Sequence, residues 1–207
     1  MSEGVKKISA AVIKRLPRYL RVFKEFEANG IETISSEKTA AYMGVTASQI
    51  RQDFCRFGCF GQRKCGYDVT SVVTELSRII GLTKRYDMII VGAGNIGRAL
   101  ANYNGFKEDG FYITALFDIC GEKDDVNGVP VYPAKRIEKY ITENGADAAV
   151  IAVPKEQARA VLDRLISAGI KYIWNFAPVE LYREGVTIEN IGIGDSLFLL
   201  CYYMNHI

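Results

Sequence analysis

The feature that most constrains the fold is the glycine-rich stretch VGAGNIG at residues 91–97. It follows a mostly apolar run of strand character (87–91) and opens a segment with helical spacing of apolar residues (95–103). Gly92, Gly94 and Gly97 form GxGxxG. In this motif the first glycine permits a tight turn, the second lets the backbone approach a pyrophosphate, and the third lets the helix pack on the sheet. The stretch therefore predicts a parallel βαβ unit that binds a dinucleotide.

Asp118 supports this interpretation because it ends the next predicted strand, FYITALFD, about 20 residues after the last glycine. A carboxylate at that place accepts hydrogen bonds from the ribose hydroxyls of adenosine and repels a 2′-phosphate, which favours NAD over NADP. Two alternatives stay open: a glycine turn that binds nothing, and a site for another adenine nucleotide such as coenzyme A.

The rest of the second half continues the alternation of predicted strands and helices. Further strands are expected in AAVIAVP (148–154) and KYIWNFAP (171–178), and helices near 133–144 and in EQARAVLDRLISAG (156–169). Continuous apolar strands that alternate with amphipathic helices predict a parallel sheet covered on both faces. The last segment, SLFLLCYYMNHI, is apolar all round and is expected to be a helix.

The first half has a different pattern. Apolar residues follow helical spacing from Ile8 to about Ala28, and Pro17 should kink or split that helix at Leu16. A short helix in SSEKTAAYMG precedes a capping box, with Thr46 as N-cap and Gln49 three residues later. The two helices joined by the GVT turn predict a helix-turn-helix.

The stretch CFGQRKCGYD follows this second helix, and its glycines break helical structure. We expect it to form a β-hairpin wing, with a further helix over 69–80. The fold class is therefore α/β, with an N-terminal winged helix-turn-helix and a Rossmann-type parallel-sheet domain. The expected domains are 1–84 (DNA-binding), 85–190 (NAD(H)-binding) and 191–207 (a C-terminal helix).

The charge of the chain is divided between the two halves. Residues 1–86 carry 15 Lys and Arg against 8 Asp and Glu, a net +7, whereas residues 87–207 carry 11 against 16, a net −5. A polyanion such as DNA would be attracted to the first half only, unless the clustering is chance. In the helix that runs from Thr46 to about Phe57, we expect Ile50, Phe54 and Phe57 to be buried. This leaves Arg and Gln side chains on the exposed face, where they suit base edges in a major groove. The residues expected at DNA are Arg15, Ser48, Gln49, Arg51, Gln52, Arg56, and Arg63 and Lys64 at the wing tip.

Other function classes are less favoured. No apolar run is long enough for a membrane span, the N-terminus lacks the apolar region of a secretory signal, and five cysteines without framework spacing suit a reducing cytoplasm. The only histidine is His206, so no proton donor is evident for a dehydrogenase. The chain is therefore not expected to be an enzyme. A small NAD-dependent oxidoreductase remains an alternative, with Tyr103 or Lys155 as the only candidate donors.

The sequence resembles the family of the redox-sensing transcriptional repressor Rex. The resemblance runs in family order through nearly the whole chain. It is carried by RLPRYLRVF (15–23), QIRQDFCRFGCFGQRKCGYD (49–68), VGAGNIGRALANYNGF (91–106), FD (117–118), IAVP (151–154), AGI (168–170) and NFAP (175–178).

The resemblance implies a cytoplasmic homodimer that binds double-stranded operator DNA through paired winged helices and has no membrane partner. NADH binding would rotate the two halves and release the DNA, whereas NAD+ would compete without releasing it. The apolar C-terminal helix would cross to the partner subunit. The cofactor residues expected are Gly92, Ala93, Gly94, Asn95, Ile96, Gly97, Tyr103, Asp118, Ile119, Val153, Pro154, Asn175, Ala177 and Pro178. The switch residues expected are Arg21, Tyr103 and position 192.

This chain departs from the family pattern at three positions. Gln52 stands where the family has a lysine, which removes a charge and favours adenine over guanine. Gly192 stands where the family has the aspartate that pairs with the arginine matched by Arg21, and Ile193 replaces a bulky aromatic residue. Asp195 either substitutes for that aspartate by a shift in register or caps the last helix. A repressor with a weakened or lost NADH response, answering to thiols or another nucleotide, is therefore the alternative.

The cysteines of the recognition region allow three interpretations. Cys55, Cys59 and Cys65 have neither a CxxC pair nor a nearby histidine, so a zinc site is the least favoured and no metal is assigned. Neighbouring basic residues would lower a thiol pKa and could make a thiol sensor. The preferred interpretation is that the cysteines are small residues filling the contact between helix and wing.

Overall fold

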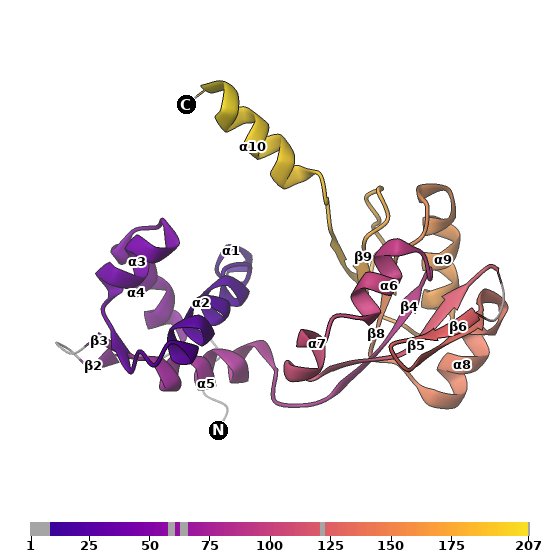
Figure 1. Ribbon diagram of the computed structural model, residues 1–207, viewed down its shortest axis with the longest axis horizontal. Coiled ribbons are helices and arrows are strands. Elements are labelled where there is room, and N and C mark those ends of the chain that lie inside the picture. The colour runs from indigo at the N-terminus through magenta and orange to yellow at the C-terminus, as the bar shows by residue number, and fades with distance from the viewer. Residues whose placement is uncertain (1–8, 58–60, 63–65, 121–122, 207) are drawn as a thin grey trace. The chain divides into compact units, whose positions relative to one another are not determined.

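A computed structural model describes residues 9–57, 61–62, 66–120 and 123–206 of the chain (Figure 1). The chain divides into two compact units, and the boundary along the sequence lies between Lys84 and Arg85. Each unit has its own hydrophobic core.

The first unit is a helical domain with a small sheet. Its described helices are α1 (Ala10–Ile13), α2 (Leu16–Ala28), α3 (Ser36–Met43), α4 (Ala47–Phe57) and α5 (Val69–Ile80). Strands β1 (Thr33–Ile34), β2 (Gly61–Gln62) and β3 (Gly66–Asp68) pair antiparallel in the order β1–β3–β2. The pair β2–β3 lies where the sequence predicts the wing; Arg63 and Lys64, expected at its tip, lie outside the described residues.

Local sequence signals set the helix boundaries in this unit. The helix is interrupted between α1 and α2, and Pro17 lies in the first turn of α2, where its missing N–H is tolerated. The Ser35 side chain accepts a hydrogen bond from the N–H of Lys38 and caps α3, which ends at Gly44 with a φ of +65°. The Thr46 hydroxyl accepts from the N–H of Gln49 at the start of α4, as expected.

An aromatic cluster holds α4 against α2 and the small sheet. The ring of Phe54 on α4 lies 5.3 Å from Tyr19, 5.7 Å from Phe23 and 4.9 Å from Tyr67, measured between ring centroids. All four side chains are buried, so the orientation of α4 depends on this contact. Phe57, expected to be buried with Ile50 and Phe54, is only half-buried.

The second unit is built on a twisted parallel sheet. Its strands are β4 (Tyr86–Val91), β5 (Phe111–Asp118), β6 (Lys123–Val126), β7 (Val129–Pro133), β8 (Ala148–Ile151), β9 (Tyr172–Asn175) and β10 (Thr187–Asn190). Its helices are α6 (Asn95–Ala101), α7 (Gly105–Glu108), α8 (Ile137–Asn144), α9 (Lys155–Ser167) and α10 (Asp195–His206), with a 3₁₀ turn at Ala134–Arg136.

The order of the strands is β10–β9–β8–β4–β5–β7–β6, and every neighbouring pair is parallel except β6–β7. Leaving out β6, this is the doubly wound order of a Rossmann fold, so the expected fold class is confirmed. The direction of winding reverses between β4 and β8. In such sheets, ligands bind at this point, outside the carboxyl ends of the strands.

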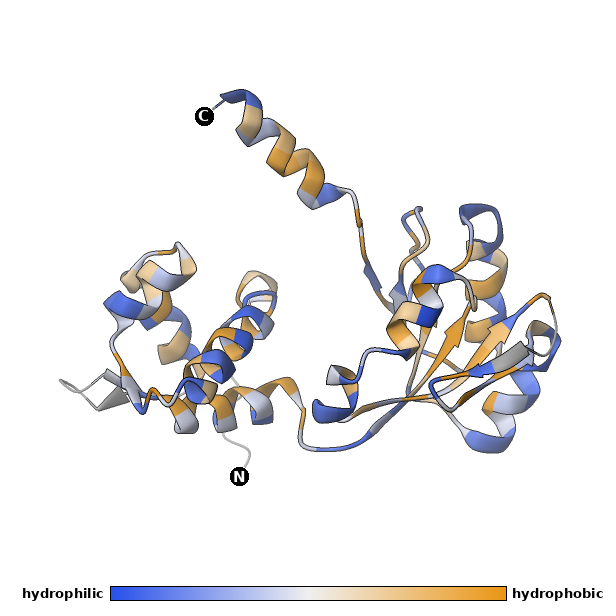
Figure 2. Cartoon of the chain, in the orientation of Figure 1, coloured by the Kyte–Doolittle hydropathy of each residue, from blue (hydrophilic) through white to orange (hydrophobic). Residues whose placement is uncertain are grey.

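Successive residues of the central strands face opposite layers of helices. On β4, Ile89 and Val91 belong to the core cluster that includes α8 and α9, whereas Met88 and Ile90 belong to the cluster that includes Ala101 of α6. The sheet is therefore covered on both faces, as its continuous apolar strands predict (Figure 2).

Two parts of this unit differ from the expectation. The hairpin β6–β7 and the edge strand β10 were not anticipated, because Lys123–Val126 and Thr187–Asn190 are short and polar and carry no run of apolar residues. The C-terminal helix spans Asp195–His206, which agrees with the helix expected in SLFLLCYYMNHI.

The C-terminal helix has an unusual surface. Every residue of α10 is exposed, including Leu197 (63%), Phe198 (75%) and Met204 (72%), and Figure 2 shows hydrophobic residues along it. Within the described ranges, no helix is long and apolar enough to cross a membrane.

Candidate functional site

A cavity of about 540 Å³ lies at the carboxyl edge of the parallel sheet. Its walls come from the segments that follow β4, β5 and β8, and from α9. The residues that line it are Val91, Gly92, Gly94, Phe117, Asp118, Ile119, Cys120, Ala134, Ala152, Val153, Pro154, Glu156, Gln157, Ala160, Val161 and Arg164. The cavity thus occupies the point where the winding of the sheet reverses.

Gly92 and Gly97 make the turn after β4 possible. Gly92 has a φ of +106°, and a Cβ there would lie 2.2 Å from the carbonyl oxygen of Ala152. A Cβ on Gly97 would lie 1.9 Å from the carbonyl oxygen of Gly92. Both positions therefore require glycine, because the backbone of one segment fills the space that a side chain would need.

Gly94 differs from these two glycines. A Cβ at Gly94 would meet no atom within 4 Å, so its backbone borders open space at the cavity. Its φ of −78° is also available to other residues. Packing within the chain therefore does not require glycine here, whereas a closely approaching ligand would.

Asp118 lies across the turn from the glycines. Its Oδ2 accepts a hydrogen bond from the N–H of Ala93 (3.0 Å), and its Oδ1 accepts from the N–H of Cys120 (2.9 Å). An ionised carboxylate has about four acceptor positions. Asp118 lines the cavity, and its carboxylate is the type of group that accepts hydrogen bonds from ribose hydroxyls.

Six of the residues that the sequence analysis assigned to the cofactor line this cavity: Gly92, Gly94, Asp118, Ile119, Val153 and Pro154. The assigned residues outside its lining are Ala93, Asn95, Ile96, Gly97, Tyr103, Asn175, Ala177 and Pro178. Gly97 supports the turn from behind, as described above.

Asn175 differs from its expected role, because its side chain is fully buried. Its Nδ2 donates to the carbonyl oxygen of Val179 and to Oδ1 of Asn190, and its Oδ1 accepts from the N–H of Ala177. These bonds tie the end of β9 to β10. The structure thus gives the Asn175 side chain a structural role.

Sequence reasoning missed the α9 side of the cavity, where Glu156, Gln157, Ala160 and Arg164 recur at helical spacing. That periodicity was the only signal, and polar residues on a helix are more often simply solvated. Arg164 is fixed by Glu138, with Nε–Oε1 at 2.6 Å and Nη2–Oε2 at 2.7 Å. The hydrogen bond from Arg164 lowers the pKa of Glu138 despite partial burial.

The exposed face of α4 is a candidate nucleic-acid surface in the first unit. Ser48, Arg51, Gln52 and Arg56 are exposed and Gln49 is half-exposed, whereas Ile50, Asp53 and Phe54 are buried. Polar and cationic side chains thus occupy the side of the helix that faces solvent, as expected for a recognition helix.

The buried Asp53 anchors α4 to the segment before α2. Arg15 binds it through two hydrogen bonds of 2.8 Å, and the hydroxyl of Tyr19 donates to its Oδ2 at 2.7 Å. Burial by itself raises the pKa of Asp53, but the bonds from Arg15 and Tyr19 and the charge of Arg15 outweigh it, so the pKa lies below its usual value. Burial and the bond to Asp53 raise the pKa of Tyr19.

This cluster changes the interpretation of Arg15, which the sequence analysis placed at DNA. Its guanidinium is engaged by Asp53, because a buried carboxylate requires a partner. Arg21, by contrast, is exposed on α2. Tyr103 is 60% exposed and packs edge-on against Phe106.

The described cysteines are free and exposed: Cys55, Cys120 and Cys201. Cys59 and Cys65 lie outside the described residues. Within the part of the chain that the structure describes, no group of three potential ligands could hold a metal ion.

Comparisons with known proteins agree with this arrangement. Residues 83–179 match the family model described as "CoA binding domain", and residues 7–55 match "Putative DNA-binding protein N-terminus". The redox-sensing transcriptional repressors Rex of Caldanaerobacter subterraneus and Clostridioides difficile are each 45% identical to the chain. The matches cover 96% of this chain and 90% of the first, and 97% of this chain and 97% of the second.

Solved structures give the same result. The chain resembles RSP in complex with β-NAD+ and operator DNA, with a TM-score of 0.88, 44% identity, and coverage of 96% of this chain and 93% of that one. It also resembles RSP in complex with β-NADH, with a TM-score of 0.88, 42% identity, and coverage of 97% and 95%.

The glycine turn predicts opposite results for two alanine substitutions. Gly92→Ala should lower the free energy of unfolding by at least about 2 kcal/mol, because it adds a backbone clash to an unfavourable φ. Gly94→Ala should lower it by less than about 1 kcal/mol, because its side chain meets open space. Urea denaturation followed by circular dichroism measures both. Equal losses in the two variants would contradict this account of the turn.

The anchor at Asp53 predicts a pH dependence of stability. Because the folded-state pKa of Asp53 lies below its unfolded value, its contribution is fully present above about pH 5 and is lost as the pH falls through the folded pKa. Asp53→Asn should cost about 1–3 kcal/mol at pH 7, since it weakens charge-assisted hydrogen bonds to a partly exposed arginine.

Urea denaturation from pH 7 down to pH 3 checks this, with exposed Glu27→Gln on α2 as control. The stability difference between wild type and Asp53→Asn should shrink toward pH 3. A difference that is constant with pH would show that the charge of Asp53 is not what matters.

Proposed function

The chain belongs to the Rex family of redox-sensing transcriptional repressors, and we propose that NADH, bound in the cavity beside Asp118, makes it release its operator DNA. The observation that carries this proposal is the coexistence, in one chain, of a nucleotide cavity at the winding reversal and a recognition helix with a cationic exposed face. One unit would sense the cofactor and the other would bind the DNA.

The cofactor is NAD, as NADH or NAD+. The described residues fit it: Gly94 leaves room for a pyrophosphate, and Asp118 offers a carboxylate to the adenosine ribose and disfavours a 2′-phosphate. Ala93, Asn95 and Ile96 would contact the phosphates through their backbone, while Ile119, Val153 and Pro154 would enclose the adenosine. We assign Tyr103, Ala177 and Pro178 to the nicotinamide side.

The DNA contacts follow from the exposure of α4. Arg51, Gln52 and Arg56 would reach base edges and phosphates in the major groove, and Ser48 and Gln49 would contact the backbone where the helix begins. Arg63 and Lys64 would contact phosphates or the minor groove from the wing. Gln52 favours adenine at the position it reads, so the operator preference should differ from that of relatives with lysine there.

The chain is a regulator, not an enzyme. The titratable residues that line the cavity are Asp118, Cys120, Glu156 and Arg164. Asp118 is engaged by the glycine turn and Arg164 by Glu138, so neither is placed as a proton donor for hydride transfer. Binding without turnover suits a sensor, because the ligand must persist long enough to report the redox state.

The exposed α10 suggests a homodimer. Leaving Leu197, Phe198 and Met204 in water would be unfavourable, whereas a second copy could bury them at about 25 cal/mol per Å². We propose that α10 makes this contact across the dimer, and that the protein acts in the cytoplasm, where its DNA and NADH are.

Gly192 bears on the switch, since the resemblance to the family implies an aspartate at this position. A Cβ at Gly192 would lie 2.2 Å from Oδ2 and 2.6 Å from Oδ1 of Asp195. The Asp195 carboxylate thus fills the space of the missing side chain. We propose that Asp195 supplies the charge that pairs with Arg21 and responds to Tyr103, so that the NADH response is retained.

Asp118 provides the test of the proposed function. Asp118→Asn should weaken NADH binding by about tenfold or more, because an amide is a poorer acceptor for ribose hydroxyls. Operator affinity without cofactor should stay within about twofold, since α4 is untouched. Fluorescence anisotropy with labelled operator and added NADH measures both, with Asp163→Asn on α9 as control. Unchanged NADH release in Asp118→Asn would contradict the proposed site.

The role of Asp195 is tested separately. Asp195→Asn should reduce the coupling between NADH and DNA by about tenfold while NADH affinity of the free protein stays within about twofold. The double variant Gly192→Asp with Asp195→Ser moves the carboxylate to residue 192 and should restore release. If Asp195→Asn still releases DNA like the wild type, Asp195 is only a helix cap.

A further inference from the structure

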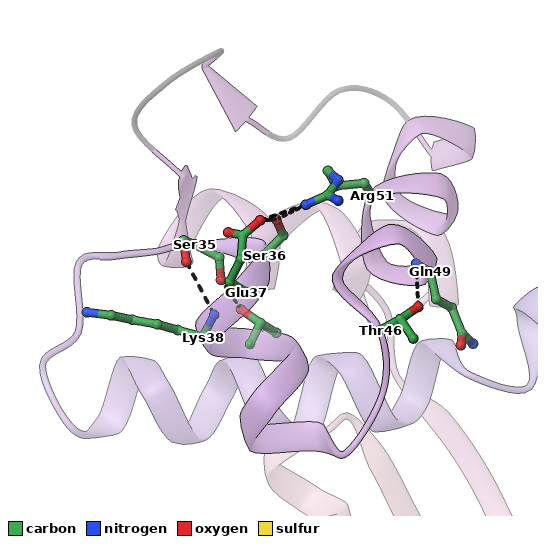
Figure 3. A network of polar contacts seen from close by, with 8 residues as sticks. Ser35, Ser36, Glu37, Lys38, Thr46, Gln49 and Arg51 are labelled. Carbon is green, nitrogen blue, oxygen red and sulfur yellow. Dashed lines mark hydrogen bonds and ion pairs between the residues drawn. The ribbon is translucent and has the colours of Figure 1, made fainter.

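The side chain of Arg51 on the recognition helix is held in place by the start of α3 (Figure 3). Its Nη1 donates to Oγ of Ser36 at 2.8 Å and to Oε1 of Glu37 at 2.7 Å. Ser36 in turn donates to Oε1 of Glu37 at 3.1 Å. The three side chains form a closed hydrogen-bonded triangle that links α3 to α4.

This triangle uses one end of the guanidinium only. Nη1 carries two hydrogens, and both are engaged by Ser36 and Glu37. Nε and Nη2, which form the parallel fork of an arginine, have no protein partner among the described residues. The Arg51 side chain is 52% exposed, so this fork can be reached by a ligand.

We infer that Glu37, together with Ser36, is a positioning residue that fixes the free fork of Arg51 to read guanine in the major groove. This inference rests on the proposed DNA binding. Guanine presents two acceptors, N7 and O6, to such a fork, whereas adenine replaces O6 by the N6 donor. When the fork is held in place, it cannot rotate away from the N6 donor of adenine, so two donors face each other. The fixed fork therefore discriminates between guanine and adenine.

Two further effects of Glu37 act in the same direction. Ordering an unrestrained arginine side chain costs about 1–2 kcal/mol of conformational entropy. Because the triangle already orders Arg51 in the free protein, part of this cost does not arise when DNA binds. The negative charge of Glu37 also offsets the attraction of Arg51 to phosphates, which carries no sequence information. Glu37 should therefore improve specificity more than affinity.

The bond between α3 and α4 could instead be a structural link only, so the test must read base preference. We would select binding sites from a randomised operator with the wild-type dimer, Arg51→Ala and Glu37→Gln. Arg51→Ala identifies the position that Arg51 reads. At that same position, Glu37→Gln should reduce the preference for guanine about fivefold to tenfold, and should leave the other positions unchanged.

The matched control is Glu75→Gln on α5, which removes a half-buried acid that pairs with Arg78 in the same unit. It changes the net charge equally and should leave every base preference unchanged. In the Arg51→Ala background, Glu37→Gln should have no further effect on preference. Urea denaturation of each variant separates a folding defect from a change in recognition.

The outcomes are distinct. If the wild type selects no sequence at all, the proposed DNA binding fails. If the wild type selects an operator but Glu37→Gln keeps the guanine preference, the inference alone is overturned. It is also overturned if Glu37→Gln weakens preference at all positions together with lowered stability, or if Glu75→Gln has the same effect.

Discussion

The close backbone contact between the turn after β4 and the end of β8 is the constraint on which the sensor unit depends. Gly92 and Gly97 allow it because the space of their missing side chains is filled by carbonyl oxygens of Ala152 and Gly92. The contact brings the end of β4 beside Val153 and Asp118, and so opens the cavity at the reversal of winding. The same turn thus combines close backbone packing at Gly92 and Gly97 with open space at Gly94, where a ligand can approach.

In the DNA-binding unit, the position of the recognition helix depends on charged side chains, as the sensor unit depends on glycines. Asp53 faces inward from α4 and is bound by Arg15 and Tyr19, so one side of the recognition helix is fixed to the domain. Arg51 faces outward and is held at one end by Glu37. The buried contact sets the position of the helix, and the exposed contact sets the direction of a side chain on it. A recognition surface is therefore prepared before DNA arrives.

Much of this arrangement could be predicted from the sequence, because its signals are local. The glycine turn, the break at Pro17 and the cap at Thr46 each follow from a few neighbouring residues. The inward direction of Arg15 and the burial of Asn175 could not be predicted, since both depend on partners 38 and 15 residues away. For Asp195 the sequence leaves two possibilities, a substitute for the aspartate at position 192 or a helix cap, and the turn before α10 places its carboxylate in the space beside Gly192.

The cofactor bound in one unit controls the affinity of the other unit for DNA. The most direct measurement is the dissociation constant of the wild-type protein for its selected operator, at fixed salt, with saturating NADH, with saturating NAD+ and with neither. The account predicts that NADH raises the constant at least fivefold, the lower end of typical coupling between sites, whereas NAD+ does not. The same constant in all three conditions would contradict it.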